Sequence, residues 1–233
     1  MINIQRILEL NKQFKSNDNS WTLWKFKWTD HWSFWILEKE WKIMLSAPHS
    51  VNHIRDNEIK GVDLMTWAIA LFLWEMLNIP VIYSKSFLVW DPNHDNYEDS
   101  EYKQFLLDYV KRNWIKMLID IHGMSITRDS LIDLGTWWEW NPNLCWNIDI
   151  LDCFINSFEK SFKNYAEKKI ITVNKYFKSE YVNTISSFIA NNTKLPSLQI
   201  EINWGLRDEK RTEDTEKLII ALSNAIEKVN IQI

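Results

Sequence analysis

The sequence has little glycine and cysteine, and it lacks long apolar runs. Glycine occurs 4 times in 233 residues, where an average usage of about 7% would give roughly 16. The cysteines, Cys145 and Cys153, are too few for a disulfide scaffold and too far apart for a CxxC metal knuckle. The longest apolar run, residues 68–74, is far shorter than a membrane span. The N-terminus lacks the basic-then-apolar order of a signal peptide, so we expect a soluble, cytoplasmic protein with no membrane partner.

An excess of one charge sign is also missing. The formal net charge is -4, and lysines alternate with acids, so the chain has no basic footprint for nucleic acid. Apolar residues make up 46% and charged residues 25%, a globular mix that excludes intrinsic disorder. No linker, repeat or low-complexity segment divides the chain, which predicts a single domain over residues 1–233. GxGxxG, Walker and GxSxG motifs are absent.

Tryptophan, in contrast, is in large excess, with 15 copies. It stands where the backbone usually needs glycine: Trp114 follows Asn113 at a helix-to-strand turn, a place typical of Asn-Gly. Trp137, Trp138 and Trp140 crowd one short loop. One interpretation is that many of these positions are glycine codons read under the wrong genetic code, with UGA as the obvious codon. The alternative is a protein that is genuinely rich in tryptophan.

Hydrophobic periodicity predicts strands that alternate with helices. Period-two alternation over residues 21–47 favours antiparallel strands at the N-terminal edge. The later predictions are strands at 80–84, 115–121, 170–173 and 197–202, and helices at 63–77, 100–112, 149–168, 182–191 and 213–229. This order is typical of a three-layer α/β/α sandwich with a mixed sheet. In such folds, ligands bind outside the carboxyl ends of the strands.

Three polar groups occur at the predicted strand ends. His49 comes directly after a strand in the run Ser-Ala-Pro-His-Ser, and Asp120 and His122 end the strand at 115–121. Glu201 interrupts an apolar strand, where a carboxylate needs a partner. Two imidazoles and a carboxylate that leave one coordination position open form a hydrolytic zinc site. A further carboxylate is then needed as the general base.

Each of these residues also has a structural interpretation. A histidine at a strand end is more often structural than a ligand, and Asp120 either orients His122 or caps a turn. His53 has ligand-like spacing from His49, but an exposed loop position is the favoured reading. His94 and His31 are expected in a loop and a turn. Neither cysteine has a neighbouring base in the sequence, which argues against a thiol nucleophile.

The motifs occur in the order of a known family. They are residues 46–50, the acid Asp63, residues 119–124 (Ile-Asp-Ile-His-Gly-Met), residues 133–136 (Asp-Leu-Gly-Thr) and residues 198–203 (Leu-Gln-Ile-Glu-Ile-Asn). Over about residues 45–208 the chain resembles the N-formylglutamate amidohydrolase family, which is similar to zinc carboxypeptidases. The resemblance implies a phosphorylase/hydrolase-like, zinc carboxypeptidase-like fold. Residues 137–140 depart from it, because the family has a glycine-rich loop there.

Carried over position by position, the resemblance implies a Zn²⁺ site. His49 and His122 correspond to metal ligands, and Asp63 to the third, with Glu58 and His53 as competitors. Glu201 corresponds to the general base or acid that activates the attacking water. Asp120 is the expected partner of His122.

Arginines are the expected contacts for a substrate carboxylate. Arg128 follows His122 by six residues, where the family has an arginine that can bind a carboxylate in a bidentate way. Arg207 and Arg55 are reserve candidates, for which a solvated surface charge is the favoured reading.

The predicted function is zinc-dependent hydrolysis of the amide bond in a small N-acyl amino acid or short amide, and this small-molecule substrate is the expected partner. The first alternative is a carboxypeptidase-like or cell-wall peptide amidase on the same metal site. The second is a non-enzymatic carbohydrate- or peptide-binding module that stacks ligands on Trp21, Trp24, Trp28, Trp32 and Trp35.

Misdecoding has a direct test in the mass of the protein. Each glycine in place of tryptophan removes an indole, so we expect the intact mass of the natively expressed protein to fall below the value for 15 tryptophans. The same gene expressed under a code that inserts tryptophan is the control. A native mass equal to that of the written sequence would end the idea.

Overall fold

A mixed sheet of seven strands forms the centre of the protein in the computed structural model, which describes residues 4–17, 33–137, 141–162 and 169–233. The strand order is β1-β5-β2-β6-β9-β7-β8. The strands are β1 (Phe34–Leu37), β2 (Ile43–Ala47), β5 (Val81–Ser84), β6 (Met117–Met124), β7 (Ser130–Gly135), β8 (Lys169–Val173) and β9 (Ser197–Asn203). β5, β2, β6 and β9 run parallel, whereas β1 at one edge and the β7–β8 pair at the other run antiparallel to them.

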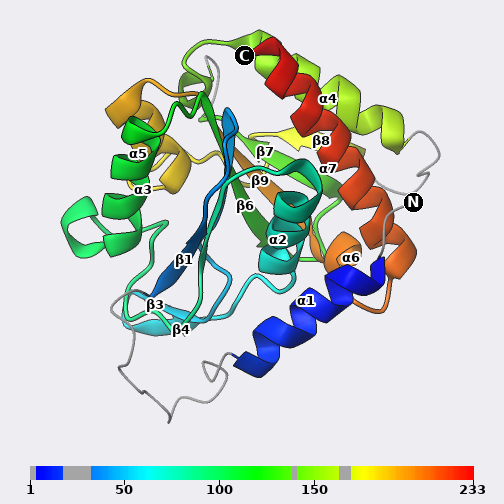
Figure 1. Ribbon diagram of the computed structural model, residues 1–233, viewed down its shortest axis with the longest axis horizontal. Coiled ribbons are helices and arrows are strands. Elements are labelled where there is room, and N and C mark those ends of the chain that lie inside the picture. Colours follow the sequence, from blue (N-terminus) through cyan, green and yellow to red (C-terminus); the bar gives the residue numbers. More distant parts are fainter. Residues whose placement is uncertain (1–3, 18–32, 138–140, 163–168) are drawn as a thin grey trace.

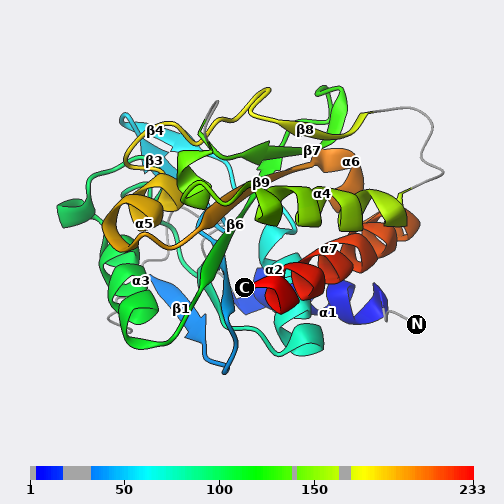
Figure 2. The same ribbon diagram turned by 90° about the horizontal axis from the view of Figure 1, so that it is seen from above.

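Helices cover both faces of this sheet, which gives three layers (Figures 1 and 2). α3 and α5 lie on one side, and α1, α2, α4 and α7 lie on the other. The helices are α1 (Ile4–Asn17), α2 (Thr66–Leu77), α3 (Glu101–Arg112), α4 (Ile148–Ser161), α5 (Ile185–Thr193), α6 (Trp204–Arg207) and α7 (Thr212–Gln232). Two 3₁₀ turns, η2 (Tyr97–Asp99) and η3 (Pro142–Leu144), and a small hairpin of β3 (His53–Arg55) and β4 (Glu58–Lys60) complete the described elements.

Alternating side chains connect the sheet to its two layers. Ile43 and Leu45 pack in the core under α2, α4 and α7, while Met44 between them packs in the core under α3 and α5. All five residues of β2 are buried, as expected for a parallel strand with helices on both faces. The helix α2 connects β2 to the parallel β5 and so forms a βαβ unit.

The predicted α/β sandwich with a mixed sheet is confirmed, and most predicted elements lie within a few residues of the observed ones. β1 is antiparallel as expected, but β2 at residues 43–47 is parallel. The antiparallel prediction for β2 rested on alternation of apolar and polar residues. Residues 43–47 are instead buried on both faces of the sheet, which is typical of a parallel strand. α1, the β3–β4 hairpin and β7 were not predicted. Residues 21–32 of the expected strands and the end of the helix expected at 149–168 lie outside the described residues.

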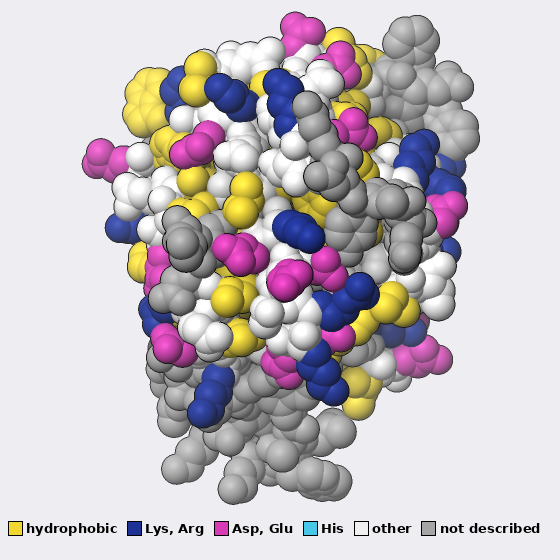
Figure 3. All heavy atoms as spheres, turned by 90° about the vertical axis from the view of Figure 1, so that its right-hand side faces the viewer, with side chains coloured by type: hydrophobic (Ala, Val, Ile, Leu, Met, Phe, Trp, Pro, Cys, Tyr) yellow, Lys and Arg dark blue, Asp and Glu magenta, His cyan; other side chains and the backbone are white. Residues whose placement is uncertain are grey.

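The side that carries α1, α4 and α7 has intermingled acidic and basic side chains with scattered hydrophobic ones (Figure 3). Within the described ranges, no helix has both the length and the apolarity that a membrane crossing requires.

Two described tryptophans occupy left-handed backbone. Trp137 has φ 63° and Trp146 has φ 68°, a region that bulky residues rarely adopt and that glycine adopts freely. Trp146 is 68% exposed and Trp114 is 87% exposed, so neither indole packs in the core. Trp67, in contrast, favours a genuine tryptophan, because it is fully buried in the core at the start of α2. Trp138 and Trp140 lie outside the described residues.

Replacing the left-handed tryptophans tests whether glycine suits these positions. We expect Trp137→Gly and Trp146→Gly each to raise the free energy of unfolding by about 1 kcal/mol, because each relieves left-handed strain. Trp74→Gly, inside α2, is the control and should lower it by about 1 kcal/mol or more. Urea denaturation measures all three. Destabilisation by both loop variants would show that the indoles contribute more than the strain costs.

Candidate metal centre

The carboxyl ends of the parallel strands bring the predicted site residues together. His122 lies within β6, and His49 follows the end of β2, which pairs with β6 in parallel register. Asp63 precedes α2, and its backbone N–H donates to the carbonyl of His49 at 2.9 Å. This bond brings the two ends of the hairpin segment together, so that His49, Asp63 and His122 meet at the carboxyl ends of the central strands.

Three ligand atoms from His49, Asp63 and His122 form a compact triangle. Nδ1 of His122 lies 3.1 Å from Nδ1 of His49. Oδ2 of Asp63 lies 3.4 Å from Nδ1 of His49 and 3.5 Å from Nδ1 of His122. Tetrahedral coordination with bonds of about 2.0–2.1 Å places ligand atoms about 3.3 Å apart. The donor set and its dimensions therefore fit a tetrahedral zinc ion with a fourth position left open.

Each histidine is held by a carboxylate on its other ring nitrogen. Nε2 of His49 lies 2.9 Å from Oδ1 of Asp91, and Nε2 of His122 lies 2.9 Å from Oδ2 of Asp120. Because an ionised carboxylate only accepts hydrogen bonds, the proton of each ring belongs on Nε2. The lone pair of each Nδ1 then points to the centre of the triangle, an orientation typical of metal-binding histidines.

Without a cation, these groups share protons among themselves. Burial disfavours the imidazolium form of His122, but the Asp120 carboxylate outweighs burial and raises the pKa of His122 well above its usual value. The pKa of His49 is likewise raised, with burial opposed mainly by Asp91. Burial would raise the pKa of Asp63, but hydrogen bonds to His122 and His49 hold that pKa well below its usual range. Asp63 is therefore an anion at neutral pH.

Glu201 lies beside the triangle in the neighbouring strand. It is directly opposite His122 in the parallel β6–β9 register, and it is 5% exposed. Burial raises the pKa of Glu201 to about 7, against the opposing charge of His122. Its Oε1 accepts a hydrogen bond from Nε2 of Gln199 at 3.0 Å. This carboxylate can exchange a proton near neutral pH.

Asp91 connects the site to the β3–β4 hairpin. Its Oδ2 lies 3.3 Å from Nε2 of His53 and accepts a hydrogen bond from Nε of Arg55 at 2.5 Å, and the His49 and His53 rings stack 4.2 Å apart. The exposed loop position expected for His53 is wrong, because β3 buries this ring to 2% exposure. His49, His53 and Asp91 also lie close enough to hold an ion, but the Arg55 cation on the same carboxylate favours a hydrogen-bonded network.

Other sequence candidates lie farther from the triangle. Glu58 is an exposed residue of β4 paired with Lys60, so the structure does not bring it to the ligand triangle. Arg128 is exposed in the turn after β6, where its guanidinium lies 4.7 Å from the Tyr176 ring and 5.8 Å from the Phe177 ring. His94 lies in a loop beside Asp95, and His31 lies outside the described residues.

Arg207 is not the solvated surface charge favoured by the sequence. It is 3% exposed, and burial lowers the pKa of its guanidinium against the opposing charges of Asp63 and Glu201. Asp91 was not singled out at all. Its only sequence signal is the Asp-Pro-Asn run that follows a strand, and that pattern is ordinary in loops. The burial of Arg207 and the contacts of Asp91 are set by the packing of distant segments, and no local motif indicates them.

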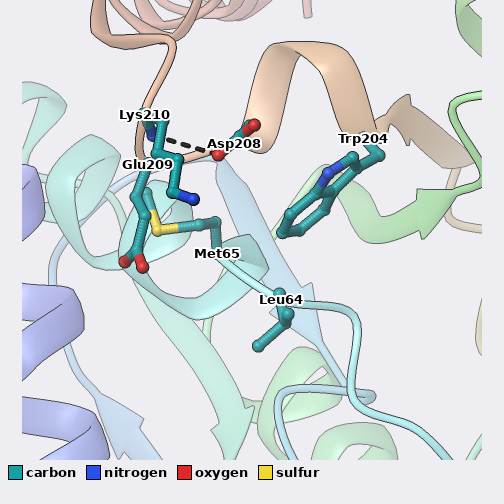
Figure 4. A pocket seen from close by; sticks show the side chains of 6 residues that line it. All are labelled: Leu64, Met65, Trp204, Asp208, Glu209 and Lys210. Atoms are coloured by element: carbon teal, nitrogen blue, oxygen red, sulfur yellow. Dashed lines mark hydrogen bonds between the residues drawn. The ribbon is translucent and has the colours of Figure 1, made fainter.

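A cavity of about 340 Å³ lies next to the site but does not include it (Figure 4). Trp204, which follows β9, lies across this cavity from Met65 and Glu209, and Leu64, which follows Asp63, also lines it. Its described lining is Leu64, Met65, Trp204, Asp208, Glu209 and Lys210. Because this lining contains no histidine and neither Asp63 nor Glu201, the cavity is separate from the candidate metal centre.

Comparison with solved structures finds the same fold in several hydrolases. The bacteriophage poly-gamma-glutamate hydrolase has a TM-score of 0.56 at 11% identity, over 88% of this chain and 91% of that chain. The N-formylglutamate amidohydrolase from Ralstonia eutropha has 0.56 at 13% identity, over 86% of this chain and 99% of that one. A metallo-carboxypeptidase from Burkholderia cenocepacia has 0.52 at 14% identity, over 85% and 60%.

These neighbours define a fold class. The carboxypeptidase-like and amidohydrolase-like fold expected from the motifs is confirmed, and the suspected family is among its members. Identities this low establish the fold alone. No family model matches the chain, and no curated protein matches it in sequence.

Removing the charge of Asp91 tests the network that orients His49. We expect Asp91→Asn to lower the free energy of unfolding by about 3 kcal/mol at neutral pH, because it leaves buried cationic partners uncompensated. The loss should shrink as the pH falls below about 3.9, the ordinary pKa of an aspartate, because the pKa of Asp91 is depressed in the folded protein and the unfolded chain takes up the proton first. Asp129→Asn, in an exposed pair with Lys175, should have little effect, because solvent screens exposed ion pairs. Equal effects of the two variants in urea denaturation would contradict this account.

Proposed function

We propose that this protein is a single-domain, zinc-dependent amidohydrolase that cleaves the amide bond of a small N-acyl amino acid. The observation that carries the proposal is the triangle of His49, Asp63 and His122, whose atoms are 3.1–3.5 Å apart, with Glu201 beside it. These distances match the spacing of ligand atoms around a tetrahedral ion. The fold shared with an N-formylglutamate amidohydrolase gives independent support.

His49, His122 and Asp63 would hold the ion through their two Nδ1 atoms and Oδ2. Zinc bound there would supply Lewis-acid polarisation of the amide carbonyl and would lower the pKa of a water. Asp91 and Asp120 keep the proton of each imidazole on Nε2, and so maintain both Nδ1 atoms as ligands.

Glu201 is the proposed general base and acid. Its carboxylate takes a proton from the attacking water as the oxygen bonds to the amide carbon, and it returns that proton to the nitrogen of the leaving amine when the C–N bond breaks. The raised pKa of about 7 suits both steps near neutral pH, because a base of this strength also releases its proton readily.

Arg128 is the proposed contact for the substrate carboxylate. Its turn follows β6, the strand that carries His122, so it lies after the carboxyl end of that strand. Stacking on Tyr176 holds the guanidinium in a defined plane, and a planar guanidinium matches the geometry of a carboxylate.

Two other functions compete with this proposal. A carboxypeptidase-like or cell-wall peptide amidase would keep the metal site but act on peptides. A stacking module would not need the metal site at all. Trp35 in β1 is 49% exposed, but Trp21, Trp24, Trp28 and Trp32 lie outside the described residues. Comparing the rates of hydrolysis of N-formylglutamate and of an unmodified tripeptide distinguishes the two enzymes. Binding of a carbohydrate or peptide that persists after the metal is removed by a chelator would favour the module.

The central test of the mechanism is Glu201→Gln, which keeps the shape and removes the base. We expect zinc content to stay nearly unchanged and turnover of N-formylglutamate to fall by about 100-fold or more. Glu58→Gln, on the exposed hairpin, is the control and should retain full activity. Loss of zinc in Glu201→Gln would make Glu201 a ligand, and full activity would remove it from the mechanism.

The pH dependence gives a separate readout of Glu201. Because the base acts when ionised, kcat/KM should rise with pH through its pKa. A bound cation lowers that pKa, so the acid limb should lie at or below pH 7. In the metal-free protein the raised pKa means that stability declines as the pH rises from the ordinary value of a glutamate to about 7. Glu201→Gln should therefore be the more stable apoprotein above pH 7, and a less stable variant would contradict the buried-charge account.

A further inference from the structure

Arg207 is a buried guanidinium that touches the backbone next to each part of the site. It ends the short helix α6, directly after β9, and is 3% exposed. Its Nε donates to the carbonyl of Ile202 at 2.9 Å, its Nη2 donates to the carbonyl of Met124 at 3.3 Å, and its Nη1 donates to the carbonyl of Leu64. All three acceptors are backbone atoms from three different segments.

These three segments carry the site. Leu64 follows the ligand Asp63, Ile202 follows the base Glu201, and Met124 lies two residues after His122. One planar side chain therefore links the backbone that presents two metal ligands to the backbone that presents the base. A lysine could not do this, because its ammonium lacks the fixed fork of five N–H donors.

Gly123 makes room for this side chain. A Cβ atom built on Gly123 would lie 2.7 Å from Nη1 of Arg207 and closer still to Cζ and Nη2, distances that real Cβ atoms essentially never show. Three atoms of the guanidinium approach the same point, so its flat face packs on the backbone of Gly123. The φ of Gly123 is not left-handed, so backbone conformation does not demand a glycine here. The position instead needs the space that the Arg207 guanidinium occupies.

The charge of Arg207 suits its place as well. Asp63 and Glu201 are the two carboxylates that interact electrostatically with it, and a buried cation there favours the ionised form of both. Its guanidinium binds three backbone carbonyls and is almost fully buried, so we assign it no contact with the substrate.

We propose that Arg207 is a positioning residue that sets the spacing of Asp63, His122 and Glu201, and that Gly123 is the space it needs. The inference rests on the proposed function. It assigns to this pair the geometry of the metal centre, so metal affinity is the property that should respond. A purely structural role would change stability and leave the affinity of the folded protein intact.

The test measures Zn²⁺ affinity by competition with a chelator, at a temperature where circular dichroism shows each apoprotein to be folded. We expect Arg207→Met and Gly123→Ala each to weaken Zn²⁺ binding by about 10–100-fold, the usual effect of losing support around a ligand. Arg207→Lys should also weaken it, because charge alone does not replace the three hydrogen bonds. Gly61→Ala, where an added Cβ meets nothing within 4 Å, should bind Zn²⁺ like the wild type.

A double-mutant cycle decides whether the two residues act as one unit. Gly123→Ala combined with Arg207→Met should bind Zn²⁺ no more weakly than the worse single variant, because the clash has no guanidinium to displace. Wild-type affinity in Arg207→Met, or multiplied losses in the double variant, would overturn the inference and leave the proposed function intact. Failure of the wild type to bind Zn²⁺ would overturn both. Should Arg207→Met not fold, Gly123→Ala and Arg207→Lys decide the question, and wild-type affinity in either would overturn the inference.

Discussion

The candidate site depends on two hydrogen bonds between buried imidazoles and buried carboxylates, Asp91 to His49 and Asp120 to His122, each 2.9 Å long. They fix the outer nitrogen of each ring as a donor and so turn both inner nitrogens toward Asp63. Burying this much charge is costly unless every member has a partner. The surrounding fold must therefore hold all five side chains in place at once.

The sheet supplies this precision. Asp120 and His122 are alternate residues of β6, so they project to the same face, and the parallel register sets Glu201 of β9 opposite His122. The remaining groups come from loops, which are fixed by hydrogen bonds to the strands. Arg207 fixes the loop of Asp63 through the carbonyl of Leu64, just as the strand register fixes the position of Glu201. A site on rigid strands, closed by loops held from behind, suits chemistry that needs atoms placed within about 0.5 Å.

Much of this could be predicted from the sequence, because burial and periodicity are local signals. The apolar runs give β6 and β9, and the motif order points to His49, His122 and Glu201. Partners from loops could not be predicted in the same way. The sequence offers no local reason for Asp91 to lie against His49 or for Arg207 to be buried, since both depend on how distant segments pack. The direction of β2 was missed for the same reason: it is set by its neighbours β5 and β6.

The central claim is that His49, Asp63 and His122 bind a metal ion, and metal analysis of the purified chain tests it most directly. The account predicts about one zinc per chain, the stoichiometry of a three-ligand site with an open position, and its loss from a folded His122→Ala variant. A folded wild-type protein that takes up no zinc when the ion is supplied would contradict the account, and so would zinc that is retained after His122 is replaced.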